Sequence, residues 1–173
     1  MFDFMKYISF ILFMLIFPIV LSAQEHPDKE KIEVSIGILG SGEEGSNFCG
    51  NLTYRYYVSG RFAVGGGLGY DLFGYPVDGG TGSLGKNSAI SLYANLQFLS
   101  PISLKTNFIV ELNGGSICGF SKHRDFDFSG LLSPQAGFSF KLKNTTSLNI
   151  KAAYKKITAT KANYWGGVLG FSF

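Results

Sequence analysis

The sequence predicts an all-β fold, an eight-stranded antiparallel up-and-down transmembrane β-barrel that follows a cleaved signal peptide. Eight stretches alternate apolar and polar residues with a period of two, the pattern of strands with two different faces. Short and long connections alternate between these stretches. Glycine accounts for 23 of the 173 residues, which disfavours a helical bundle. The scattered net charge of +3 does not indicate a nucleic-acid partner.

The N-terminal residues have the pattern of a secretory signal. Ile8 to Leu21 is uncharged, Lys6 precedes it and Ala23 offers a small residue for cleavage. The stretch is shorter than the roughly 20 residues of a membrane-spanning helix, and Pro18 interrupts it. We therefore expect residues 1–23 to be a signal peptide and residues 24–173 to form one barrel domain.

Turn residues separate the eight expected strands, and no window has the 3.6-residue apolar period of a helix. In chain order the strands are Ile32–Leu39, Phe48–Val58, Arg61–Leu72, Ala89–Leu99, Ser103–Ile117, Leu131–Leu142, Ser147–Ile157 and Tyr164–Phe173.

Each strand has one apolar face and one face that carries the charges. A soluble lipocalin-like barrel would turn the apolar face inward, whereas a transmembrane barrel would turn it toward lipid. The strands match the roughly 9–11 residues that a tilted strand needs to cross a bilayer. Aromatic residues near both ends of the apolar face match interface girdles. They are Tyr70, Tyr154 and Trp165 at one edge, and Phe62, Phe98, Phe140 and Phe173 at the other.

The connections also favour the transmembrane orientation. The joins after the second, fourth and sixth strands are short, and those after the odd-numbered strands are long. Outer-membrane barrels have short periplasmic turns and longer extracellular loops. The sequence therefore predicts an integral protein of a Gram-negative outer membrane.

The chain ends in Tyr-Trp-Gly-Gly-Val-Leu-Gly-Phe-Ser-Phe. With the signal peptide, the eight strands and the loop asymmetry, this ending resembles the small OmpA/OmpX-type outer-membrane β-barrel family. The resemblance implies a structural or surface-interaction role through the extracellular loops. It also implies that the outer-membrane assembly machinery recognises the terminal aromatic face. The residues of this assembly signal would be Trp165, Leu169, Phe171 and Phe173.

Charged residues on the inward face are expected to form a structural plug. A charge in a narrow lumen must be paired, because an isolated buried charge is costly. The residues at suitable depths are Glu33, Arg55, Lys105, Glu111 and Lys151. A proton or ion path through the same residues is the alternative.

The third long loop carries the candidate surface contacts Lys122, His123 and Arg124. We expect its cations to contact lipopolysaccharide phosphates. The alternative is a lipid-modifying barrel enzyme, an acyltransferase or deacylase, which would need a Ser/His pair at the outer rim. No catalytic, metal-binding or cofactor-binding residue is assigned, and no cofactor is expected.

Two cysteines, Cys49 and Cys118, would lie in an oxidising compartment, where disulfides form. They fall on the second and fifth strands, which are nearly opposite in an eight-stranded ring. A bridge would need the third long loop to fold over the mouth of the barrel, because bridged Cα atoms lie within about 7 Å. The sequence leaves pairing open.

Overall fold

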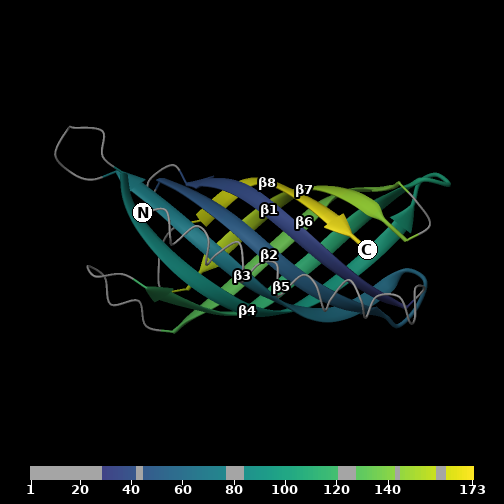
Figure 1. Ribbon diagram of the computed structural model, residues 1–173, viewed down its shortest axis with the longest axis horizontal. Helices are drawn as coiled ribbons and strands as arrows, with labels where there is room; N and C mark the ends of the chain where they lie inside the picture. The colour runs from purple at the N-terminus through teal and green to yellow at the C-terminus, as the bar shows by residue number, and fades with distance from the viewer. Residues whose placement is uncertain (1–28, 42–44, 77–83, 121–127, 143–144, 159–162) are drawn as a thin grey trace, which may run out of the picture.

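The computed structural model is a closed barrel of eight antiparallel strands (Figure 1). It describes residues 29–41, 45–76, 84–120, 128–142, 145–158 and 163–173. Each strand pairs with the next one along the chain, and β8 pairs with β1 to close the ring. The fold class predicted from the sequence is confirmed. Within the described residues there is no helix long and apolar enough to cross a membrane.

The eight strands follow the polar alternation of the sequence closely. Their bounds are β1 Glu30–Ser41, β2 Gly45–Tyr57, β3 Phe62–Pro76, β4 Leu84–Pro101, β5 Thr106–Phe120, β6 Ser129–Lys141, β7 Ser147–Ile157 and β8 Asn163–Ser172.

Three details of the ladder differ from the expectation. The connection after the first strand, expected to be long, has only residues 42–44, because β1 and β2 pair as far as Ser41 opposite Gly45. The β3–β4 hairpin is longer, because pairing continues to Pro76 opposite Leu84. In the β6–β7 ladder the pairing steps from Leu132 opposite Lys156 to Gln135 opposite Ala153. The missing rungs coincide with Pro134, which has no amide hydrogen to donate. The register is the same on both sides of this gap, so the wall continues past it.

The outer face of the barrel is apolar. Ile36 is 52% exposed and Leu92 is 65% exposed, and both project from the middle of their strands. All eight strands contribute large outward apolar side chains. The charged face lies inside, so the structure contradicts the soluble lipocalin-like alternative, in which the apolar face would form the core.

The interior is divided into layers along the barrel axis. At the end with the long connections, most inward side chains are apolar and buried, with the buried amide of Asn47 among them, and the rings of Phe73 and Tyr164 pack at 5.5 Å between centroids. The other apolar members of this layer are Leu39, Ala89, Ile117, Leu131, Ile157 and Val168. Glu33, Arg55, Glu111 and Lys151 lie deeper, toward the end with the short turns. An apolar layer thus covers the polar interior on its long-loop side.

Candidate functional site

Four buried charged side chains form a closed ring across the lumen. Arg55 of β2 contacts both carboxylates, with Nη1 at 3.0 Å from Glu33 Oε2 and Nη2 at 3.1 Å from Glu111 Oε1. Lys151 of β7 contacts the same two carboxylates from the other side, with Nζ at 2.6 Å from Glu33 Oε1 and 3.0 Å from Glu111 Oε2. Each acid therefore has two cations and each cation has two acids.

This ring has no net formal charge and almost no exposure to solvent. The four side chains are only 1–2% exposed. Charges removed from water lose several kcal/mol of hydration each, and only well-placed partners compensate for that loss. The reciprocal geometry supplies these partners, since every charged end has two of them. The ring fixes how β1, β2, β5 and β7 sit relative to one another.

Neutral side chains satisfy the remaining polar atoms of the ring. Arg55 Nε donates to Asn95 Oδ1 at 2.7 Å, and Asn95 Nδ2 donates to Asn113 Oδ1 at 2.6 Å. Gln97 Nε2 donates to Glu111 Oε1 at 2.7 Å. On the other side, Asn149 Nδ2 donates to Glu33 Oε2 at 2.5 Å. The amides extend the network to β4, which carries no charged member of the ring.

Inward glycines provide the space that these large side chains occupy. A Cβ on Gly67 of β3 would lie 2.6 Å from the Tyr93 ring, whose hydroxyl is 2.8 Å from Thr53 Oγ1. A Cβ on Gly170 of β8 would lie 2.9 Å from Glu33 Oε1. The glycines of β3 and β8 therefore leave space in the lumen, which side chains of the neighbouring strands β4 and β1 occupy.

A second charged cluster lies nearer the apolar layer. Lys155 of β7 forms an ion pair with Asp71 of β3, and Asn47 Nδ2 donates to the same Asp71 oxygen at 3.1 Å. Asp71 and Asn47 are completely buried. Alternation along β3 and β7 places Asp71 and Lys155 on the inward face. Register alone does not indicate that pair, because Lys155 reaches across the lumen.

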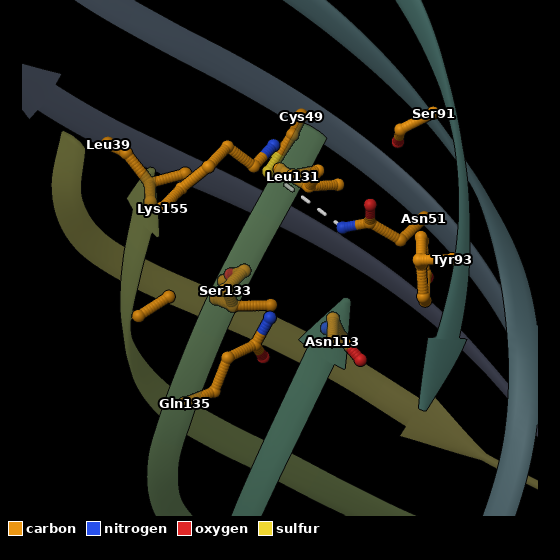
Figure 2. A pocket seen from close by; sticks show the side chains of 12 residues that line it. Leu39, Cys49, Asn51, Ser91, Tyr93, Asn113, Leu131, Ser133, Gln135 and Lys155 are labelled. Atoms are coloured by element: carbon orange, nitrogen blue, oxygen red, sulfur yellow. Dashed lines mark hydrogen bonds between the residues drawn. The ribbon is translucent and has the colours of Figure 1, made fainter. Parts of the chain in front are cut away.

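Lys155 also lines a small cavity, whose wall combines polar and apolar side chains (Figure 2). About 10 Å³ of it is open to the centre of a water molecule, which is room for one water. Asn51 Nδ2 points toward Cys49 Sγ at 3.8 Å. Ser91 Oγ and Gln135 Oε1 have no hydrogen-bond partner among the described residues. A cavity of this size accommodates solvent and no organic substrate.

The structure brings together four of the five residues predicted for the plug. Lys105 does not belong to it, and this part of the prediction is wrong. Strand β5 begins at Thr106, so Lys105 lies in the exposed turn between β4 and β5, outside the lumen. The expected loop contacts Lys122, His123 and Arg124 and the expected signal peptide lie outside the described residues.

The two cysteines are not joined in the structure. Cys49 points into the barrel and is buried. Cys118 is partly exposed, and it pairs across the β4–β5 ladder with Ile90, so both residues face outward. The thiols thus lie on opposite sides of the wall as well as on distant strands, which prevents a bridge.

The residues proposed as an assembly signal all face outward on β8 or directly after it. The ring of Trp165 packs against that of Tyr154 of β7, with 4.4 Å between centroids and 52° between the ring planes. Leu169, Phe171 and Phe173 follow on the same face with similar exposure. This continuous apolar edge is the geometry that the hypothesis requires, and its recognition by assembly machinery stays a prediction.

Comparison with known proteins identifies the fold but no family. No protein-family model and no curated protein matches the sequence. Among solved structures, the outer membrane protein OprG from Pseudomonas aeruginosa has a TM-score of 0.56 at 12% identity, with 86% of this chain and 97% of that chain covered. Outer membrane protein Ail from Yersinia pestis has a TM-score of 0.50 at 21% identity, covering 84% of this chain and 100% of that one.

The outer membrane enzyme PagL has the same fold, with a TM-score of 0.51 at 12% identity, covering 82% of this chain and 98% of that chain. The resemblance to small outer-membrane barrels is therefore confirmed at the level of the fold. The fold is shared by proteins with and without enzymatic names, so the particular role must come from the residues of this chain.

Proposed function

We propose that this protein is an integral outer-membrane barrel that acts as a rigid anchor, and that it presents its long loops to partners at the cell surface. The observation that carries the proposal is the inversion of the wall, with an apolar exterior around a fully paired charged interior. A bilayer core is the environment in which such an exterior is stable. The fold and the apolar outer surface therefore both support a location in the outer membrane.

The interior supports an anchoring role. The charged ring uses all its members in mutual contacts, and the cavity beside it has room for one water. Function in such a scaffold falls to the connections, and the two longest of them, between β3 and β4 and between β5 and β6, lie at the same end of the barrel. The expected partners are lipopolysaccharide, through the third long loop, and an extracellular molecule.

A lipid-modifying activity is the second hypothesis, and no observation in the described residues favours it. Both histidines of the sequence, at positions 26 and 123, lie outside the described part of the chain. The hypothesis predicts release or transfer of an acyl chain by purified barrel incubated with lipopolysaccharide. His123→Ala would abolish that activity, and the anchor proposal predicts that no activity is found.

Surface display of epitopes tests the proposal. A short epitope is inserted after residue 80 in the second long loop, and as a matched control between Ser59 and Gly60 in a short turn. Antibody should label intact cells with the first insertion and only permeabilised cells with the second. Labelling of the short-turn insertion on intact cells, or recovery of the protein in the soluble periplasm, would overturn the proposal.

A further inference from the structure

The short-turn end of the barrel presents a repeated arrangement of an exposed aliphatic residue and an exposed cation. Val58-Ser59-Gly60-Arg61 joins β2 to β3, and Ile102-Ser103-Leu104-Lys105 joins β4 to β5. At the third turn, Lys141 is the last residue of β6 and Leu142 follows it. These seven aliphatic and basic residues form the turn face, which consists of Val58, Arg61, Ile102, Leu104, Lys105, Lys141 and Leu142.

The turns are held in defined conformations. The amide of Val58 donates to the Phe62 carbonyl at 3.0 Å, and the amide of Ile102 donates to the Thr106 carbonyl at 2.9 Å. In both turns the serine hydroxyl accepts a bond from the amide of the basic residue at 3.4 Å. The cations are thus presented by ordered backbone.

The cations of the turn face have no acidic partner among the described residues. All three are exposed, and none takes part in an ion pair. Lys105 and Lys141 are neighbours, because the Lys141 amide donates to the Lys105 carbonyl at 2.8 Å. The sequences of the three turns, 58–61, 101–105 and 142–146, contain no Asp or Glu. Adjacent like charges repel unless an anion lies near them.

The position of these cations relative to the aromatic edge indicates which anion they meet. Arg61 directly precedes the outward residue Phe62, and Lys141 directly follows the outward residue Phe140. Both cations have the inward parity but are exposed at the rim, one residue beyond the aromatic side chains. Such a girdle marks the boundary between hydrocarbon and headgroups. The headgroup layer beyond it is roughly 5–8 Å thick, the length of about two strand residues. The cations therefore lie at headgroup level.

The aliphatic members strengthen this assignment. Leu104 is fully exposed, and Val58, Ile102 and Leu142 are each more than half exposed. Apolar side chains beside cations are typical of protein surfaces that contact anionic lipid. The apolar side chains contact the upper part of the acyl chains, and the cations contact the phosphates.

We propose that the turn face is a binding surface for anionic phospholipid headgroups of the inner leaflet, with the Lys105–Lys141 pair as its centre. This inference rests on the proposed function, which places the short turns on the periplasmic side. Each cation near an anionic surface strengthens binding by about five-fold at moderate salt. The barrel should therefore select an anionic phospholipid over a zwitterionic one.

Spin-labelled lipids test the inference in the whole barrel. The protein is reconstituted in phosphatidylcholine vesicles with spin-labelled phosphatidylglycerol or phosphatidylcholine, and the immobilised fraction is measured by electron spin resonance. K105Q/K141Q removes two cations of the turn face. K86Q/K156Q removes two cations at the long-loop end and is the charge-matched control.

Wild type and control should bind phosphatidylglycerol at least about ten-fold more tightly than phosphatidylcholine at low salt, and K105Q/K141Q should lose most of that preference. Folded protein without a preference, or an equal loss in both double variants, would overturn the inference alone. Failure of the wild type to insert into either vesicle would overturn the proposed function together with it.

Discussion

Lys151 of β7 reaches across β8 to Glu33 of β1, with Nζ 2.6 Å from Oε1. The strand between them carries Gly170 at this level, and a Cβ there would lie 2.9 Å from Glu33 Oε1. The ion pair therefore spans the seam where the last strand closes on the first. It links parts of the chain 118 residues apart, so it forms only when the barrel closes.

Removal of the guanidinium should destabilise the barrel strongly. Arg55→Ala leaves Glu33 and Glu111 with one shared cation, so one negative charge is buried without compensation. Breaking a buried network in this way costs about 3–5 kcal/mol. Urea unfolding in zwitterionic detergent, followed by the fluorescence of the single tryptophan, Trp165, measures the loss. Arg61→Ala, an exposed turn residue, should change stability by less than about 0.5 kcal/mol.

Because the ring is neutral, the losses of stability caused by substitutions of Glu111 and Lys151 should not be additive. Glu111→Gln leaves an excess cation and Lys151→Gln an excess anion, whereas the double variant retains the neutral pair of Glu33 and Arg55. We expect the double variant to lose less stability than the sum of the single losses, by about 0.5–3 kcal/mol. Additive losses in the same unfolding assay would show that the four residues do not act as one network.

Two glycines on opposite faces of the wall should respond differently to the same change. Gly67→Ala places a Cβ 2.6 Å from the Tyr93 ring and the Leu52 carbonyl, which should cost about 1–3 kcal/mol. Gly167→Ala adds a methyl group to open space on the outer face. Its unfolding midpoint should be unchanged or higher. Equal effects at the two positions would contradict the orientation of the faces.

A charged residue on the outer face should lower the stability of the barrel in a bilayer. Leu92→Lys puts an ammonium near the middle of the exposed apolar belt, where it costs about 2–4 kcal/mol. Leu104→Lys is the control, because Leu104 is fully exposed in a turn beyond the belt. Folding yield and urea midpoint in phospholipid vesicles should fall for the first variant only. An unaffected Leu92→Lys would mean that this surface does not meet hydrocarbon.

Alternation along the strands was sufficient to predict the eight elements, and the bounds of β7 match the expectation residue for residue. It predicted the inward positions of Glu33, Arg55, Glu111 and Lys151 for the same reason, since parity assigns each residue to a face. Alternation does not show whether a residue lies within the barrel or beyond the end of its strand. Lys105 shares the inward parity but lies past the barrel edge, in a turn.

The remaining features depend on relations across the lumen or outside the membrane. The Asp71–Lys155 pair joins β3 to β7, and which inward side chains meet across a barrel depends on shear, which local sequence does not encode. The β3–β4 hairpin continues through Gly74 to Pro76. The sequence predicted a loop there, because glycine and proline are typical of turns. Apolar residues of inward parity at the long-loop strand ends, such as Leu39 and Ile117, were the available signal for the apolar layer.

Heat modifiability in native membranes tests the central claim most directly. The full chain is expressed in a Gram-negative host, outer membranes are isolated, and samples are run on a denaturing gel with and without boiling. The account predicts a band in this fraction whose mobility changes on boiling, because the closed barrel resists detergent until heated. A band in the soluble periplasm, with the same mobility in both lanes, would contradict it.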